Sequence, residues 1–239
     1  MINIVLGIVQ GFTEALPISS SGHLYIISKI LGKDISSLTI EIMANTGSLI
    51  AVIIYYRHKI KDIFLDKNYI IKIVIGTIPA VMFGLLFKDI LESNINTKLI
   101  GIAFIITSLF LYLVKDKNGE KNNVSILDSL IIGLYQAVAL VPGISRSGST
   151  IIGGLNQNLE RETAFDYSFM LYIPISIGSL VLGIEDVSGN INEYLVIIVV
   201  SAIFTYISII LFSKVIKNGK LLIFSIYTLV LGLITFFII

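Results

Sequence analysis

Two short polar stretches hold almost every residue of this chain that could do chemistry. The first, GIVQGFTEALPISSSGH, runs from Gly7 to His23, and the second, GLYQAVALVPGISRSGST, runs from Gly133 to Thr150. When they are aligned, a Gly, a Gln, a Pro and an Ile-Ser-x-Ser-Gly group recur in both, which indicates an internal repeat. We expect the two stretches to meet and to form one site.

The first stretch opens with a glutamine and a carboxylate. Gln10 and Glu14 are four residues apart, so both side chains lie on one face of a helix. A carboxylate inside a membrane segment costs about 2.5 kcal/mol or more unless it is paired or wetted. Glu14 is therefore predicted to be functional, with a structurally satisfied carboxylate as the alternative. Gln10 could equally serve helix packing.

The segment Pro17–His23, PISSSGH, ends one helix and begins another. One serine would suffice as an N-cap, but here Ser19, Ser20 and Ser21 precede a histidine. The free N–H groups of a helix N-terminus also bind anions. Ser20 or Ser21 could be a nucleophile with His23 as its base. His23 could instead attack phosphorus or protonate a leaving phosphate.

The second polar segment, Pro142–Thr150, reads PGISRSGST and combines a tight turn with an arginine. Gly143 permits the turn, and Arg146 offers a fork of donors that matches phosphate. The hydroxyl groups predicted to bind the same anion belong to Ser145, Ser147 and Thr150. The segment lacks the Gly-Lys-Ser/Thr of a Walker loop. A plain turn with a snorkelling arginine is the alternative, but the apolar flanks make snorkelling difficult.

The composition indicates an integral membrane protein. Of 239 residues, 55% are hydrophobic and only 14% are charged, with a mean hydropathy of +0.93, whereas soluble domains carry about 25% charged residues. A net charge of +1 gives no reason to expect nucleic acid, and the absence of cysteine excludes disulfides. Two histidines cannot form a His-rich metal cage, but carboxylates and phosphate oxygens could hold a divalent cation. The first basic residue is Lys29, so the N-terminus does not resemble a signal peptide.

The elements that must position these residues are predicted from hydropathy. Six segments are long enough to span a bilayer, namely Leu38–Tyr56, Tyr69–Phe87, Lys98–Val114, Ala164–Gly183, Tyr194–Phe212 and Leu221–Ile238. Residues 2–31 and 126–156 are apolar but interrupted by Pro, Gly and Ser, so each is predicted to be a re-entrant helical hairpin. The expected fold is an all-α polytopic membrane protein with six transmembrane helices and two re-entrant hairpins.

The chain is predicted to be a single membrane domain, residues 1–239, built from two repeats. Repeat one covers about residues 1–114, a linker covers 115–125, and repeat two covers 126–239. Three spans per repeat is an odd number, so the repeats must be inverted. Twelve of the 17 Lys and Arg residues fall in the loops Arg57–Lys72, Lys115–Lys121, Asn156–Thr163 and Lys214–Lys220. The positive-inside rule then places the first hairpin, and the opening of the site, at the outer face. Glu41, Asn45 and Thr46, at the start of the first span, could reach that hairpin.

These motifs resemble those of the undecaprenyl pyrophosphate phosphatases of the bacitracin-resistance family. That family carries Glu/Gln-xxx-Glu, Pro-x-Ser-Ser-x-Gly-His and Pro-Gly-x-Ser-Arg-Ser, which match Gln10–Glu14, Pro17–His23 and Pro142–Ser147. Residues 47–52 and 76–80 are also similar to family segments. Two positions depart from the pattern. Gln10 stands where many members have Glu, which weakens metal binding, and Asn45-Thr46 replaces a usual His.

The resemblance implies hydrolysis of undecaprenyl diphosphate to the monophosphate and phosphate in the bacterial plasma membrane. This reaction recycles the carrier for peptidoglycan and confers bacitracin tolerance. The partners are then the polyprenyl diphosphate lipid and the bilayer, and we also consider a homodimer. A divalent cation, Mg²⁺ or Ca²⁺, is implied. The candidate metal ligands are Glu14 and Gln10. The candidate catalytic residues are Glu14, Ser20, His23 and Arg146. The candidate substrate-binding residues are Gln10, Ser19, Ser21, Gly143, Ser145, Ser147 and Thr150.

Two points stay open on the sequence alone. The nucleophile is Ser20, His23 or an activated water. The rival function is a polyprenyl-phosphate transporter or flippase, because inverted repeats with broken helices also hold the substrates of secondary transporters. A lipid-binding scaffold without catalysis explains the anion site but not the Glu-Ser-His group.

Overall fold

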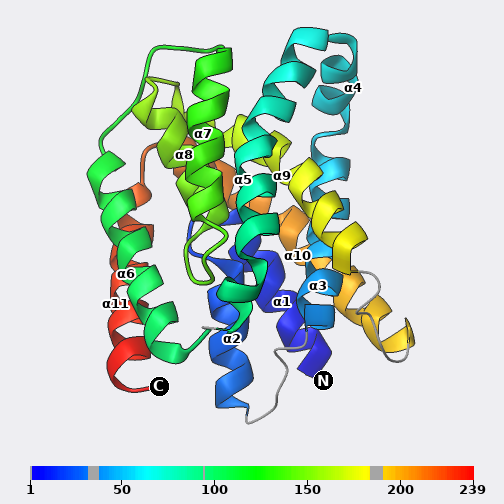
Figure 1. The fold of residues 1–239 in the computed structure, drawn as a ribbon, viewed down its shortest axis with the longest axis vertical. Coiled ribbons are helices and arrows are strands. Elements are labelled where there is room, and N and C mark those ends of the chain that lie inside the picture. Colours follow the sequence, from blue (N-terminus) through cyan, green and yellow to red (C-terminus); the bar gives the residue numbers. More distant parts are fainter. Residues whose placement is uncertain (1, 32–37, 94, 184–190) are drawn as a thin grey trace.

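The computed structural model describes the chain except for residues 1, 32–37, 94 and 184–190. Its regular elements in the described part are helices, which Figure 1 labels. They are α1 (Ile2–Ala15), α2 (Ser20–Ile30), α3 (Leu38–Tyr55), α4 (Arg57–Leu65), α5 (Lys67–Ser93), α6 (Thr97–Val114), α7 (Ile126–Val138), α8 (Arg146–Asn156), α9 (Arg161–Gly183), α10 (Ile191–Lys217) and α11 (Leu221–Phe237).

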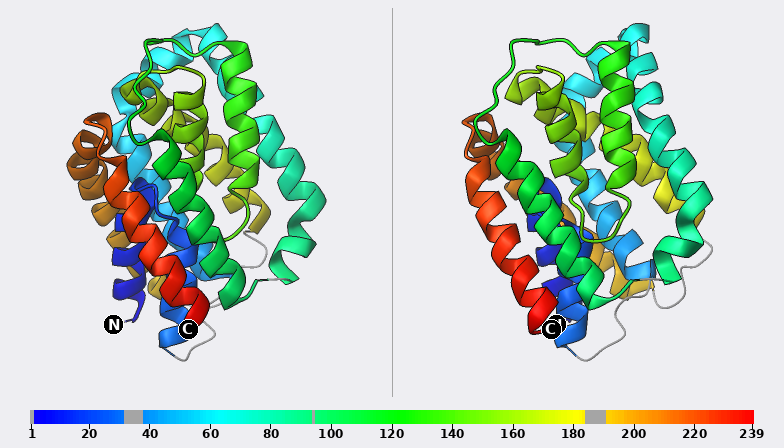
Figure 2. Two further views of the ribbon diagram at one scale, coloured as in Figure 1. Left: turned by 90° about the vertical axis from the view of Figure 1, so that its left-hand side faces the viewer. Right: turned by 60° about the vertical axis from the view of Figure 1, so that its left-hand side comes forward.

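Two helix pairs enter the molecule from opposite ends. The pair α1–α2 rises from one end and the pair α7–α8 descends from the other, and their non-helical tips approach one another near the middle (Figure 1). Both chain termini lie at the end of the molecule where α1 starts and α2 ends (Figures 1 and 2). The two interrupted segments of the sequence are therefore helix–tip–helix pairs, and their polar motifs lie at the tips.

The same local chemistry breaks both pairs. Pro17 has no N–H to donate and disfavours helical backbone at the preceding residue, so α1 ends at Ala15. Ser19 then adopts a positive φ of 67°, and its side chain caps α2 by accepting from the Gly22 N–H at 3.4 Å. In the second tip Gly143 takes the positive φ, 95°, and Ser145 caps α8. Proline thus ends α1, glycine makes the turn that follows the end of α7 at Val138, and serine starts the second helix of each pair.

The outer surface of the molecule is apolar, as a lipid environment requires. Four helices, α5, α6, α9 and α10, are each long and apolar enough to cross a membrane, and the pair α3 and α4, bent by 73°, makes a fifth candidate. Large side chains such as Leu85, Leu86 and Val181 are more than 60% exposed. The chain is therefore a multi-pass membrane protein. Each of the six predicted spans coincides with a helix, although α11, with 17 residues, falls short of a full span by length.

Small residues allow the helices to approach closely. A Cβ atom added to Gly47 of α3 or to Gly11 of α1 would meet the backbone or side chains of α10 at 2.9 Å or less. A Cβ atom on Gly101 of α6 or on Gly232 of α11 would likewise meet the facing helix at 2.9 Å or less. These two helices run side by side in Figure 2. Close packing replaces the hydrophobic effect as the source of cohesion between helices inside a membrane.

One prediction about the loops is wrong. The segment Arg57–Lys72 was expected to be a loop, but it contains all of α4 and the first turns of α5. The residues of α4 are mostly polar and none of them is buried, so hydropathy alone could not distinguish this surface helix from a loop.

The linker between the two halves ends in a capping box. Ser125 accepts from the Asp128 N–H at 3.1 Å, and the Asp128 carboxylate accepts from the Ser125 N–H at 2.9 Å. Lys121 also donates to Asp128 at 3.1 Å. This reciprocal arrangement satisfies backbone groups at the start of α7.

We expect Asp128→Ala to destabilise the protein by about 1 kcal/mol, because a cap acceptor and the partner of Lys121 are lost together. Thermal unfolding in detergent measures the change. Asp116→Ala is the matched control, because Asp116 lies in the same linker with its side chain 89% exposed and 4.0 Å from Lys115. Equal unfolding temperatures for the two variants would contradict the capping role.

Candidate active site

The carboxylate of Glu14 is the centre of a buried hydrogen-bond network. One oxygen accepts from Arg146 Nη2 at 2.6 Å, and the other accepts from the Ser20 hydroxyl at 2.6 Å and from Gln10 Nε2 at 3.1 Å. These four residues come from α1, α2 and α8, and all four were predicted from the sequence. The ion pair with Arg146 therefore joins the two helix pairs, and the Ser20 hydroxyl, which donates to the same carboxylate, joins α2 to α1.

Residues of α9 hold the arginine in place. Arg146 Nη1 donates to the Ser168 carbonyl at 3.3 Å, and the guanidinium lies 4.3 Å from the centre of the Tyr172 ring. The Tyr172 hydroxyl in turn donates to the Asn45 side-chain oxygen at 2.6 Å. The face of an aromatic ring attracts a cation, so Tyr172 of α9, itself held by α3, helps to fix the position of Arg146.

A cavity of about 160 Å³ adjoins this network. Its volume corresponds to on the order of five water molecules, enough for a small anion and part of its hydration shell. The cavity lies between α1, α2, α3 and α9 and is lined by Gln10, Glu14, Ser20, Ser21, Leu24, Glu41, Ile42, Asn45 and Ser179. Glu41 and Asn45 therefore lie beside the first hairpin, as predicted. The Thr46 hydroxyl instead donates to a carbonyl of its own helix at 2.7 Å.

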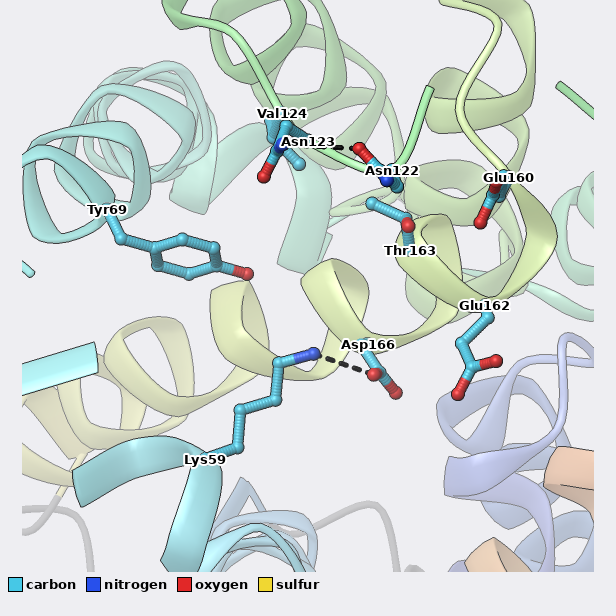
Figure 3. Close-up of a pocket in the computed structure, with 9 residues that line it drawn as sticks. All are labelled: Lys59, Tyr69, Asn122, Asn123, Val124, Glu160, Glu162, Thr163 and Asp166. Carbon is cyan, nitrogen blue, oxygen red and sulfur yellow. Dashed lines mark hydrogen bonds and ion pairs between the residues drawn. The ribbon is translucent and has the colours of Figure 1, made fainter. Parts of the chain in front are cut away.

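A second, larger cavity of about 260 Å³ lies near the end of the molecule that carries α4 (Figure 3). Lys59 and Asp166 form an ion pair of 2.6 Å there, beside Tyr69 and the carboxylates of Glu160 and Glu162. None of the residues of the two polar motifs lines it. Of these two cavities, only the smaller one is lined by residues of the network around Glu14. It is therefore the candidate active site.

The two tips interlock at close range. The Ser147 hydroxyl donates to the Leu16 carbonyl at 3.0 Å, across from α8 to the tip of the first pair. A Cβ atom on Gly22 would lie 3.2 Å from the Gly143 Cα, and one on Gly148 would lie 3.3 Å from Pro17. Both distances are shorter than ordinary van der Waals contact, so a side chain at either position would push the neighbouring tip away by a few tenths of an ångström. The two polar stretches do meet, as their types and spacing suggested.

His23 does not join the network around Glu14. Its Nδ1 lies 2.6 Å from the Ser19 carbonyl, and its Nε2 lies 2.8 Å from the Tyr227 hydroxyl of α11. Phe104 packs edge-on against the imidazole. His23 is not among the described residues that line the cavity, so both ring nitrogens are held by other parts of the protein.

The remaining predicted residues mostly shape the tips. Ser19 and Ser145 are the N-caps of α2 and α8, and Gly143 makes the turn before α8. The Thr150 hydroxyl bonds to the Ser168 hydroxyl at 2.6 Å, inside the α8–α9 contact. Among the predicted binding residues, Ser21 and Gln10 line the cavity.

Three contributors were missed in the sequence. Ser168 and Tyr172 of α9 are four residues apart, and this spacing on one helix face was the available signal. Tyr227 carries no such signal, because it reaches His23 only through the packing of α11 against α6.

The cavity offers the ligands that a hard cation prefers. Two carboxylates, Glu14 and Glu41, and two amides, Gln10 and Asn45, share its lining. Such an all-oxygen set suits Mg²⁺ or Ca²⁺. Within the described residues, no group of three His, Cys, Asp or Glu side chains gathers at a metal-binding distance. The residues fit a cation whose coordination is completed by the oxygens of a bound phosphate.

The fold and the site define a polytopic helical membrane protein with a buried acid–arginine–serine centre. Comparison with known proteins gives the family. The family model described as "Bacitracin resistance protein BacA" matches residues 3–234, and this chain belongs to that family.

Curated relatives agree over nearly the whole chain. "Undecaprenyl-diphosphatase 1" of Bacillus cereus (strain ATCC 14579) is 38% identical and covers 97% of this chain and 95% of its own length. "Undecaprenyl-diphosphatase 1" of Halalkalibacterium halodurans is also 38% identical, over 97% and 93% of the two chains. "Undecaprenyl-diphosphatase 4" of Bacillus thuringiensis (strain Al Hakam) is 41% identical, over 96% and 93%.

We expect Gly143→Ala to destabilise the protein by about 1–3 kcal/mol, because alanine is strained at a φ of 95°. The new methyl group would also lie 2.7 Å from the Ala103 Cβ. Gly178→Ala in α9 is the control, since a Cβ there meets nothing within 4 Å, and alanine favours the helix. Unfolding in detergent compares the two, and a Gly143→Ala variant as stable as Gly178→Ala would refute the strained turn.

Proposed function

We propose that this protein hydrolyses undecaprenyl diphosphate to undecaprenyl phosphate and inorganic phosphate. The observation that carries the proposal is the Ser20 hydroxyl, which donates to Glu14 at 2.6 Å beside Arg146 and a cavity of anion size. A hydroxyl bonded to a carboxylate is an activated nucleophile. The printed names of the relatives agree with this activity. The consequence would be recycling of the lipid carrier for the cell wall, and with it tolerance of bacitracin.

The geometry supports an attack by Ser20. The oxygen of Ser20 would bond to the terminal phosphorus while Glu14 takes the hydroxyl proton, and the bond from that phosphorus to the bridging oxygen would break. Polyprenyl phosphate would leave first. Glu14 would pass this proton to the departing polyprenyl phosphate and could then deprotonate the water that attacks the phosphoserine. The proton taken from water would return to the Ser20 oxygen as phosphate leaves, which restores the serine hydroxyl. If water attacks the diphosphate directly, Glu14 is the same base and Ser20 only orients it.

Stabilisation of charge would account for most of the catalysis, as in other phosphoryl transfers. Arg146 would supply a fork of donors beside Glu14, and Ser20 and Ser21, which line the cavity, stand at the N-terminus of α2, where a helix favours an anion. A bound Mg²⁺ or Ca²⁺ would neutralise further phosphate charge. Glu14 and Gln10 would hold it, with Glu41 and Asn45 available on the α3 side of the cavity.

The proposed membrane arrangement has six spans and two re-entrant pairs, α1–α2 and α7–α8, in an inverted repeat. Their entry from opposite ends of the molecule and the location of both termini at one end support it (Figure 1). Because Lys and Arg are concentrated in the loops predicted to be internal, the cavity would open to the outer face. The homodimer stays a prediction that sedimentation in detergent can test. The names of the relatives favour the phosphatase over the transporter.

The first experiment measures phosphate release from undecaprenyl diphosphate by the purified protein in detergent, where no compartments exist. We expect cation-dependent release that falls by about 10²-fold or more in Ser20→Ala, Glu14→Gln and Arg146→Lys. Lysine keeps the charge of Arg146 but cannot reproduce its fork of donors. Thr46→Ala, whose hydroxyl serves its own helix, should stay within about two-fold of wild type.

Each outcome of that experiment has a consequence. No release from folded wild-type protein would reject the phosphatase and favour transport. Release that survives in Ser20→Ala but disappears in Glu14→Gln would assign the attack to water. Release unaffected by EDTA would remove the cation from the proposal.

The direction of the opening is tested with single cysteines, since the chain has none of its own. A membrane-impermeant thiol reagent added to intact cells should label Ser21→Cys, in the cavity, but not Asn122→Cys, in the linker predicted to be internal. The reverse pattern would overturn the outward opening. Labelling of both residues after permeabilisation confirms that each cysteine is reactive.

A further inference from the structure

His23 lies on a different side of α2 from the candidate active site. Ser20, Ser21 and Leu24 line the cavity, whereas His23 contacts Phe104 of α6 and Tyr227 of α11. The imidazole is 8% exposed, and its ring lies parallel to the Tyr227 ring with centroids 5.7 Å apart. Both ring nitrogens of His23 are already hydrogen-bonded, so it would have to give up a partner before it could accept the proton of Ser20.

The hydrogen bonds of His23 determine where its proton lies. A carbonyl oxygen only accepts, so Nδ1 carries a proton and donates it to the Ser19 carbonyl at 2.6 Å. In the neutral ring Nε2 is then the acceptor, and the Tyr227 hydroxyl donates to it at 2.8 Å. The Ser19 carbonyl thus selects this tautomer, and Tyr227 supports it, because a phenol hydroxyl, although it can also accept, is the better donor.

The Ser19 carbonyl belongs to a strained part of the backbone. Ser19 has a φ of 67° and is, with Asn158, one of two non-glycine residues in the described part of the chain with a positive φ. A serine in this region persists only when its surroundings hold it there. The same peptide unit leads directly into Ser20, so its orientation decides where the Ser20 hydroxyl points.

Resting on the function proposed above, we propose that His23 and Tyr227 are positioning residues for Ser20. Tyr227 holds His23 in the Nδ1–H tautomer, Nδ1–H holds the Ser19 carbonyl, and the peptide held in this way directs the Ser20 hydroxyl onto Glu14. The proton of Ser20 goes to Glu14, which it already contacts at 2.6 Å. His23 then acts through Ser19 rather than as an acid, a base or a nucleophile.

The first test compares substitutions that keep or lose the donor of His23. The amide nitrogen of Asn corresponds to Nδ1, and that of Gln corresponds to Nε2. His23→Ala should lower kcat for phosphate release by about 10²-fold, the cost of a misplaced reacting group. His23→Asn should recover at least about tenfold of this loss, His23→Gln should recover little, and the pH profile of His23→Asn should keep the shape of the wild type.

Tyr227→Phe keeps the stacked ring but removes the hydroxyl. We expect it to lower kcat about five-fold with little change in KM, as for one lost hydrogen bond. The same change should have no effect in the His23→Asn background, because an amide has no tautomer to select. Tyr112→Phe, at a half-exposed position on α6, is the matched control.

A second measurement does not depend on catalysis. The chain has two histidines, so ¹⁵N-histidine spectra of the protein in detergent can be assigned with a His58→Asn variant. We expect His23 to be protonated on Nδ1, and Tyr227→Phe to shift the population toward the Nε2–H tautomer. This result can stand even if phosphate release fails, which separates the positioning pair from the proposed function.

Three outcomes would overturn the proposal. One is a dominant Nε2–H tautomer in the wild type. Another is a His23→Asn variant as inactive as His23→Ala that also loses one limb of the pH profile, which would make His23 an acid or base. The third is a Tyr227→Phe variant with wild-type activity and an unchanged tautomer.

Discussion

The buried ion pair between Glu14 and Arg146 is the contact on which the site depends. Its two members come from different helix pairs, and their side chains are 8% and 14% exposed. Neither charge could stay alone in so apolar a molecule, because the loss of one partner from a buried pair costs several kcal/mol. The pair therefore requires the two tips to meet, and it places the Glu14 carboxylate between the guanidinium and the Ser20 hydroxyl, with one oxygen bonded to each.

The same pair poses a problem for any phosphate ligand. Arg146 already donates to Glu14 and to the Ser168 carbonyl, and its guanidinium carbon lies over the Tyr172 ring. A guanidinium has five N–H donors, so it can bind a phosphate oxygen while it keeps these partners. The contacts from α9 hold the arginine in place against Glu14, which lines the cavity, so little reorganisation would be needed when an anion enters.

Much of this architecture could be predicted because it depends on local properties of the chain. Every span predicted from hydropathy coincides with a helix, and Pro17 and Gly143 mark the two tips. Hydropathy failed at α4, where a polar surface helix has the same composition as a loop. The meeting of Gln10, Glu14, Ser20 and Arg146 could be expected as well, because charges inside an apolar protein need partners.

The sequence by itself determined that this chain is a bundle of membrane helices with two interrupted pairs and one polar centre. Only the tertiary structure decided which residues of that centre line the cavity and which lie away from it. It placed Glu14 and Ser20 on the cavity and directed His23 toward Tyr227, which is 204 residues further along the chain. The physical reason is that helix periodicity specifies which side chains share a face, whereas a hydrogen-bond partner depends on which helix packs there.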